Sequence, residues 1–205
     1  PTGSSATINQ FKDLIDFSKK HKILLINDNP YSFILNNEFI SLLSIKNAKE
    51  NCMELNSLSK AFNLSGWRVG MLLGSKENIS RILKVKSNMD SGMFYGIQKG
   101  AIQALNLDNK WFDSLNVIYS KRRILMWELA SILKCEVDKS SKGLFVWAKL
   151  PVGINSSEQF INNILTEKNI FIAPGTIFGS NGEGYIRFSL CIDEEKIKEF
   201  IKRFK

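Results

Sequence analysis

Apolar residues recur along the chain at spacings that alternate between helical and strand-like. From Thr7 to about Lys20 they return every three or four residues, which predicts an amphipathic helix. These residues are Ile8, Phe11, Leu14 and Ile15. Thr7 and Gln10 fit a capping box at the start of this helix. An uninterrupted apolar run at 23–26 follows, and we expect it to be a strand buried on both faces, as in a parallel sheet covered by helices.

The same alternation continues to about residue 110. We expect strands at 39–40, 52–55 and 67–74, and helices at 77–86 and 97–105. The polar stretch 106–110 reads as a boundary.

The remainder has the pattern of a smaller α+β unit. We expect a long amphipathic helix at 111–133, strands at 135–137, 144–150, 170–172 and 185–190, and helices at 157–168 and 193–204. The pattern therefore predicts an α/β protein with two domains, 1–110 and 111–205.

Composition narrows the functional classes. The chain has 205 residues, of which 44% are hydrophobic, enough for one core or two small ones. Its net charge of +8 comes from basic residues spread along the chain, so we expect no nucleic-acid partner. No apolar run approaches the ~20 residues of a membrane span, so we expect no membrane partner. Three widely spaced cysteines show no metal-binding pattern and favour free thiols in a reducing compartment, so we expect no metal and a cytoplasmic location.

The stretch 56–70, NSLSKAFNLSGWRVG, carries the most specific chemistry. Lys60 is its only charge before Arg68, and two serines, Ser57 and Ser59, stand just before the lysine. An amine can condense with an aldehyde, while hydroxyls and a guanidinium can hold a phosphate. Judged on S-x-S-K alone, the favoured interpretation is a strand, a polar loop and a second strand with a stray lysine.

The longer pattern S-x-S-K-x-F-x-x-x-G-W-R-x-G closely resembles the lysine motif of class I/II aminotransferases, which bind pyridoxal 5'-phosphate (PLP). The resemblance implies the PLP-dependent transferase fold type I, with part of the large-domain sheet and its flanking helices at 1–110 and a small α+β C-terminal domain at 111–205. It also implies that Lys60 carries the internal Schiff base, that Ser57 and Arg68 hold the cofactor phosphate, and that Ser59 assists.

Two residues follow the predicted strand 23–26. Asp28 and Tyr31 stand where open α/β sheets place their ligand chemistry, although an aspartate there also suits an ordinary turn. By resemblance, Asp28 pairs with the pyridine nitrogen of the cofactor and Tyr31 hydrogen-bonds its ring oxygen. A carboxylate at that nitrogen keeps the ring protonated and able to accept electrons.

Arg187 stands among apolar residues in the predicted strand 185–190. Its partner could be an Asp or Glu of the same chain, or it could occupy an exposed edge. It follows the sequence 174–179, PGTIFG, which is similar to a P-G-x-x-F-G turn of the same family. The resemblance implies that Arg187 binds the α-carboxylate of the substrate, for which a planar guanidinium is well suited.

The resemblance covers essentially the whole chain and corresponds to roughly the C-terminal half of a full-length family member. It implies transamination between an amino acid and a 2-oxo acid by a homodimer, with the segment 87–96, including Phe94 and Tyr95, approaching the partner subunit. A β-lyase or a decarboxylase on the same fold remains an alternative. So does a half-enzyme that is inactive by itself, and we expect the 205-residue chain to bind PLP weakly and turn over poorly.

Overall fold

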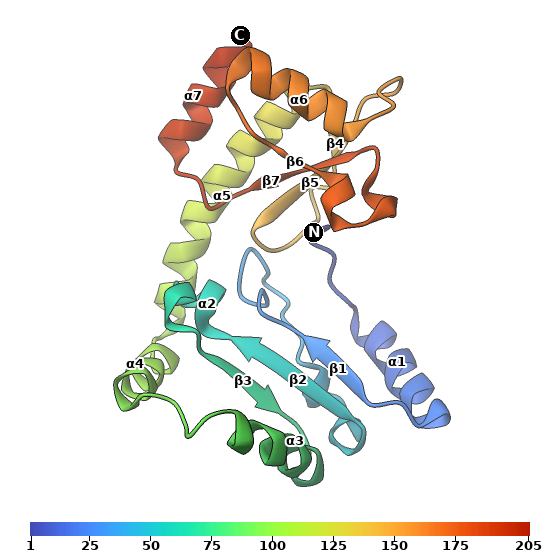
Figure 1. Ribbon diagram of the computed structural model, residues 1–205, viewed down its shortest axis with the longest axis vertical. Coiled ribbons are helices and arrows are strands. Elements are labelled where there is room, and N and C mark those ends of the chain that lie inside the picture. Colours follow the sequence, from blue (N-terminus) through green and yellow to red (C-terminus); the bar gives the residue numbers. More distant parts are fainter. The chain divides into compact units, whose positions relative to one another are not determined.

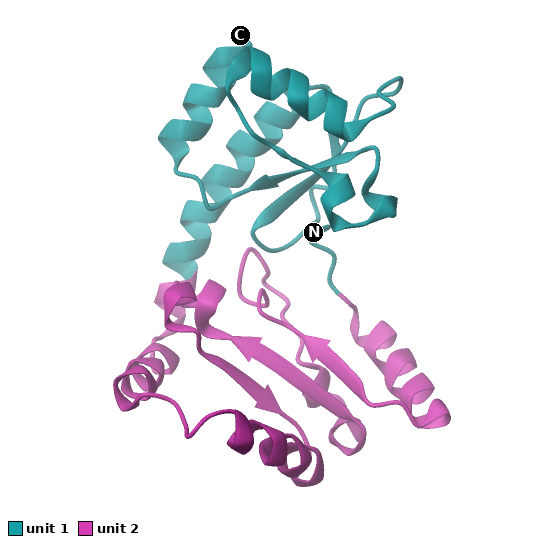
Figure 2. Ribbon diagram, viewed as in Figure 1, with its two compact units in different colours: residues 1–5, 113–205 teal, residues 6–112 magenta.

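The computed structural model describes residues 1–205 and divides the chain into two units (Figure 2). One unit contains 6–112, and the other contains 1–5 together with 113–205. The assignment of 1–110 to a PLP-binding domain and of 111–205 to a small domain remains a prediction. No helix combines the length and the apolar character that a membrane crossing needs.

The unit 6–112 is built on a three-stranded sheet in the order β1-β2-β3 (Figure 1). Strands β1 and β2 are parallel, and β3 runs antiparallel to β2. Its strands are β1 (Leu25–Asp28), β2 (Cys52–Ser57) and β3 (Gly70–Leu73). Its α-helices are α1 (Ile8–His21), α2 (Leu58–Ala61), α3 (Lys76–Met89) and α4 (Tyr95–Leu105). Three short 3-10 helices complete it: η1 (Leu42–Ser44), η2 (Ala48–Glu50) and η3 (Ser65–Trp67).

Helix α1 begins as the sequence predicts. Thr7 accepts a hydrogen bond from the backbone of Gln10, whose side chain in turn accepts one from the backbone of Thr7, which completes the capping box. Phe11 and Ile15 then pack against Leu42 of η1 in a buried cluster that also includes Ala48 and Cys52. The cluster thus joins α1 and η1 to the first residue of β2.

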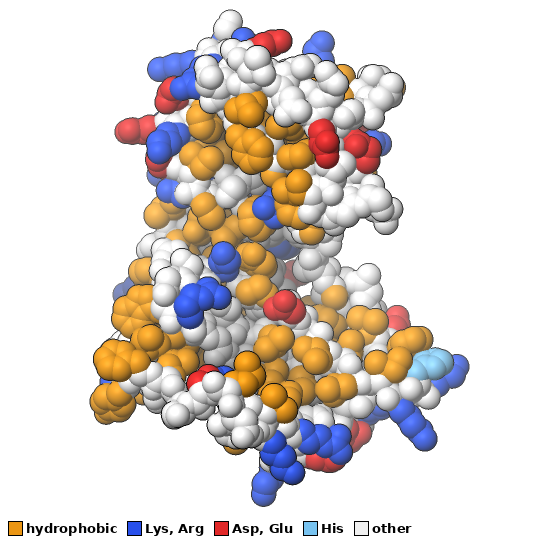
Figure 3. Space-filling view, in the orientation of Figure 1, with side chains coloured by type: hydrophobic (Ala, Val, Ile, Leu, Met, Phe, Trp, Pro, Cys, Tyr) orange, Lys and Arg blue, Asp and Glu red, His pale blue; other side chains and the backbone are white.

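The expectation of a strand at 23–26 buried on both faces is wrong. Strand β1 begins at Leu25, and its side chains alternate between half-buried and exposed. Ile26 is 47% exposed and Leu55 of β2 is 38% exposed. Apolar side chains accordingly lie at the surface over β1 and β2 in the space-filling view (Figure 3). The expected strand at 39–40 is also absent, because the chain there leads into η1.

The other unit contains a four-stranded antiparallel sheet in the order β4-β5-β7-β6. Its strands are β4 (Glu136–Val137), β5 (Phe145–Lys149), β6 (Ala173–Pro174) and β7 (Tyr185–Ser189). Its helices are α6 (Ser157–Lys168) and α7 (Glu194–Phe204), together with most of α5 (Asn109–Ile132). Two 3-10 helices, η4 (Gly175–Phe178) and η5 (Ser180–Gly182), connect β6 to β7. The strand expected at 170–172 lies instead at 173–174.

The connection between β6 and β7 depends on two glycines. A Cβ on Gly175 would lie 2.0 Å from the carbonyl oxygen of Gly182, and a Cβ on Gly182 would lie equally close to the carbonyl oxygen of Gly175. Only residues without side chains allow the two backbones to approach so closely. This close approach sets the course of the chain from β6 through η4 and η5 into β7.

Candidate active site

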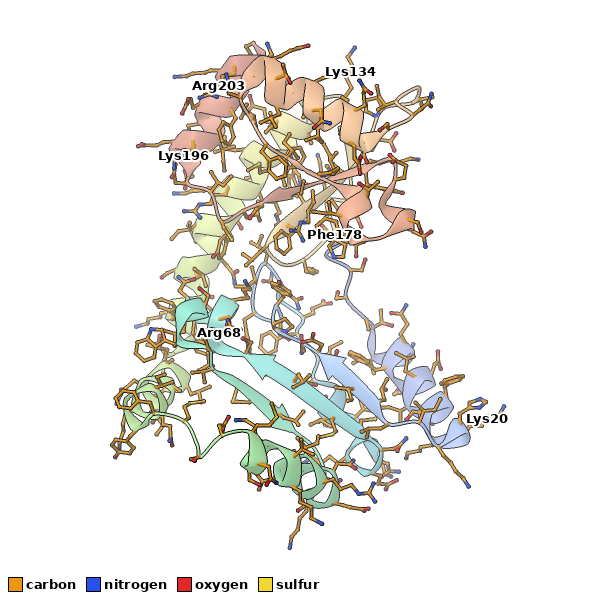
Figure 4. All side chains as sticks on the ribbon, in the orientation of Figure 1. Lys20, Arg68, Lys134, Phe178, Lys196 and Arg203 are labelled. Atoms are coloured by element: carbon orange, nitrogen blue, oxygen red, sulfur yellow. The ribbon has the colours of Figure 1, made fainter.

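The register of the three-stranded sheet places several of the predicted site residues at one edge. Asp28 ends β1 and pairs with Leu55, so the carboxyl ends of the parallel strands β1 and β2 share that edge. Ser57 ends β2 and pairs with Gly70, the first residue of the antiparallel strand β3. Arg68, two residues before Gly70, therefore lies at the same edge, beside the end of β2 (Figure 4).

Lys60 lies immediately beyond this edge, on the single turn α2. Ser57 caps that turn by accepting a hydrogen bond of 3.1 Å from the backbone nitrogen of Ser59. Lys60 and Ser59 are half-buried. Arg68 is exposed and donates to the carbonyl oxygen of Ser65 over 3.0 Å, with its backbone in the left-handed region at φ 54°. The local fold thus brings an amine, two hydroxyls and a guanidinium into one short stretch.

Tyr31 lies three residues beyond Asp28, in the turn that follows β1. The backbone nitrogen of Asn29 donates to the carbonyl oxygen of Leu55 over 2.9 Å, which extends the pairing of β1 with β2 by one residue. The carbonyl oxygen of Tyr31 accepts from the backbone nitrogen of Ile34 over 3.0 Å. Asp28 is exposed and Tyr31 is half-buried. Both residues therefore sit on a segment fixed by backbone hydrogen bonds.

An aromatic cluster that the sequence analysis missed connects the tyrosine segment to the lysine segment. Phe33, two residues after Tyr31, stacks on Phe112 with ring centroids 4.9 Å apart. Phe62, two residues after Lys60, meets the same Phe112 ring edge-on at 5.4 Å. Only the two-residue offsets of Phe33 and Phe62 from the predicted site residues hint at this cluster in the sequence.

Arg187 lies in the other unit, on β7. Ile186 and Phe188 on either side of it point into the core, whereas Arg187 is half-buried on the opposite face. Its guanidinium carbon lies 4.0 Å from the ring centroid of Phe145 and 4.1 Å from that of Phe178, the phenylalanine of the PGTIFG turn. Two aromatic rings thus contact this guanidinium.

The model of the aminotransferase class I and II family matches residues 1–204. The chain belongs to this family. Class I and II aminotransferases are PLP-dependent enzymes of fold type I, and the α/β fold of this chain agrees with that membership.

Relatives of known name are also aminotransferases. The chain is 36% identical to LL-diaminopimelate aminotransferase of Aquifex aeolicus and 39% identical to that of Halothermothrix orenii, in each case over all of this chain and 53% of the relative. Among solved structures, apo-BacF from Bacillus subtilis superposes with a TM-score of 0.91 at 33% identity, over 99% of this chain and 52% of that one. A probable N-succinyldiaminopimelate aminotransferase from Thermus thermophilus also reaches a TM-score of 0.91, at 32% identity, over 100% of this chain and 55% of that one. The chain thus spans about half the length of the relatives that it matches.

The groups at the sheet edge fit the cofactor of the class I and II aminotransferase family. PLP presents an aldehyde, a phosphate, a ring nitrogen and a ring oxygen, and the edge supplies an amine, hydroxyls with a guanidinium, a carboxylate and a phenol. The strand register places Asp28, Ser57 and Arg68 at this edge, Lys60 follows on α2, and Tyr31 follows the end of β1. The unit 6–112 therefore carries a group that fits each of these four parts of PLP.

Proposed function

We propose that this chain carries the PLP-binding lysine of an aminotransferase that moves an amino group between an amino acid and a 2-oxo acid. The observation that carries the proposal is the sheet register, which brings Asp28, Ser57 and Arg68 to the edge next to Lys60. Family membership and the names of the relatives support the reaction type.

Each residue has a distinct task in this proposal. When bound, PLP supplies an aldehyde that bonds to amines and a ring that accepts the electron pair left at the substrate Cα after proton loss. Lys60 would hold the cofactor through its amine and would carry the proton of the substrate Cα, for which the same amine is already in place. Asp28 keeps the ring nitrogen protonated and Tyr31 donates a hydrogen bond to the ring oxygen.

The remaining residues bind anionic groups. Ser57 and Arg68 hold the phosphate, with Ser59 contributing its hydroxyl. Arg187 binds the α-carboxylate of the substrate, and the rings of Phe145 and Phe178 support the guanidinium for that task. LL-diaminopimelate is the first amino donor to test, because the named relatives are LL-diaminopimelate aminotransferases.

The proposal extends to the assembly and to the activity of the 205-residue chain. We expect a cytoplasmic homodimer in which Phe94 and Tyr95, 74% and 66% exposed, contact the partner subunit. We expect the 205-residue chain alone to bind PLP weakly and turn over poorly, because the relatives are about twice as long as the part matched here.

Borohydride trapping tests the proposed lysine directly. The purified chain is incubated with increasing PLP, reduced with borohydride and digested, and pyridoxyl adducts are quantified by mass spectrometry. We expect Lys60 to be labelled at lower PLP concentrations than any other lysine, and the adduct to disappear in Lys60→Ala but to persist in Lys49→Ala, which removes an exposed lysine of the same unit.

Equal labelling of Lys60 and Lys49 across the titration would overturn the assignment of Lys60.

Product analysis tests the reaction type. Transamination is supported if the donor releases a 2-oxo acid only when an acceptor 2-oxo acid is present. Release of pyruvate with ammonia would indicate a β-lyase instead, and release of carbon dioxide a decarboxylase.

A further inference from the structure

A buried carboxylate lies beneath the candidate active site, and the site as described does not use it. Glu54, in the middle of β2, is 4% exposed. Burying a carboxylate costs free energy unless hydrogen bonds replace its water shell. Five donors surround the two oxygens of Glu54, and they come from β1 and the residue after it, from β2 itself and from the start of η1.

The donors divide between the two carboxylate oxygens. Oε2 accepts from the backbone nitrogen of Leu42 at 2.7 Å, the hydroxyl of Ser41 at 2.9 Å and the amide of Asn27 at 3.5 Å. Oε1 accepts from the amides of Asn56 at 3.0 Å and Asn29 at 3.3 Å. An ionised carboxylate only accepts hydrogen bonds, so every group around it has to be a donor.

The position of these donors connects Glu54 to Asp28. Asn27 pairs with Glu54 in the parallel register, and Asn29 lies two residues farther on. Because side chains alternate along a strand, Asn27 and Asn29 project to the face of Glu54 and Asp28 to the opposite face. Glu54 therefore accepts hydrogen bonds from the residues immediately before and after Asp28, on the face of the sheet opposite the Asp28 side chain.

The same network reaches the segment that carries Tyr31. The side-chain oxygen of Asn29, whose amide donates to Glu54, accepts a hydrogen bond from the hydroxyl of Ser32. Ser32 in turn accepts at its carbonyl oxygen from the amide of Asn36 over 3.1 Å. The residues two before and one after Tyr31 are thus bonded to each other and, through Asn29, to the buried carboxylate.

We propose that Glu54 is a positioning residue that holds Asp28 and the Tyr31 turn in the geometry that PLP requires. This inference rests on the proposed function, because it concerns the same site. Glu54 acts only through the asparagines and does not touch the cofactor or substrate. Substitution of Glu54 should therefore make Asp28 and the Tyr31 turn more mobile without removing any group that binds PLP.

The test compares Glu54→Gln with two controls of the same unit. Glu50→Gln removes an equal charge from an exposed carboxylate that pairs with Lys19, and Leu42→Ala removes buried apolar contacts without removing a donor to Glu54. Each 205-residue variant is examined under conditions where circular dichroism shows it folded. Two quantities are measured: amide hydrogen exchange of peptides covering 27–36, and the PLP concentration that half-labels Lys60 after borohydride reduction.

We expect Glu54→Gln to speed exchange at 29–36 and to raise the half-labelling concentration about tenfold, the size of effect that loss of supporting hydrogen bonds has around metal ligands. Glu50→Gln and Leu42→Ala should leave both quantities near those of the unchanged chain. The proposal is overturned if Glu54→Gln matches the unchanged chain in either quantity, or if Leu42→Ala reproduces its effects, since a purely structural role would then suffice. Selective labelling of Lys60 in the unchanged chain tests the proposed function, and its absence would count against that function. The hydrogen-exchange data would still decide whether Glu54 holds the segment 29–36.

Discussion

The substitution Phe112→Leu tests whether the aromatic cluster stabilises the site segments. Phe112 contacts Phe33 at 4.9 Å and Phe62 at 5.4 Å between ring centroids. Leucine keeps an apolar side chain at this position but removes both ring pairs. The segments of Tyr31 and Lys60 would then lose their shared aromatic partner.

The magnitude follows from the two contacts. An aromatic pair contributes roughly 0.5–1.5 kcal/mol beyond its buried area, so two pairs contribute about 1–3 kcal/mol. All three rings are half-buried, which favours the lower part of this range, about 1–2 kcal/mol. With a urea dependence of about 2 kcal/mol per molar, the unfolding midpoint of this unit should fall by roughly 0.5–1 M.

The assay is urea unfolding monitored by hydrogen exchange of peptides from the unit 6–112. These peptides report the unfolding midpoint of this unit separately from that of the other unit. Phe171→Leu is the matched control, because Phe171 is 69% exposed and lies in the other unit. We expect Phe112→Leu to lower the midpoint and to speed exchange at 31–39 and 58–64. A midpoint shift no larger than that of Phe171→Leu would refute the reasoning.

Two further predictions concern stability. Thr7→Ala removes the acceptor of the 3.2 Å bond from the backbone of Gln10, so the free energy of unfolding should fall by about 1 kcal/mol in urea, whereas Thr2→Ala, at an exposed position outside any helix, should leave it unchanged. Burial raises the pKa of the Cys135 thiol from an ordinary 9.0 to about 11. The unfolded chain therefore loses this proton first, so the contribution of the neutral thiol is complete below about pH 9 and is lost as the pH rises towards 11. Urea unfolding between pH 8 and 11 should show a smaller decline for Cys135→Ala than for the unchanged chain, and equal declines would contradict the role of burial.

Local sequence determined the elements that depend on neighbouring residues. The capping box of Thr7 and Gln10 and the start of α1 follow from residues within one turn of helix. The glycine, serine and lysine spacing of 56–70 indicated the family, because a cofactor motif is largely a local arrangement of side chains.

Tertiary structure decided which residues meet. A continuous apolar run at 23–26 predicts burial on both faces, yet Ile26 is 47% exposed, because a strand buries only the faces that other elements cover. Phe33 and Phe112 are distant in the sequence, and no local pattern predicts that their rings stack. Glu54 reads as an ordinary polar residue within a strand. Only the parallel register of β1 and β2 and the return of η1 bring four of the five donors to its carboxylate, because the fold supplies the hydrogen-bond partners of a buried carboxylate.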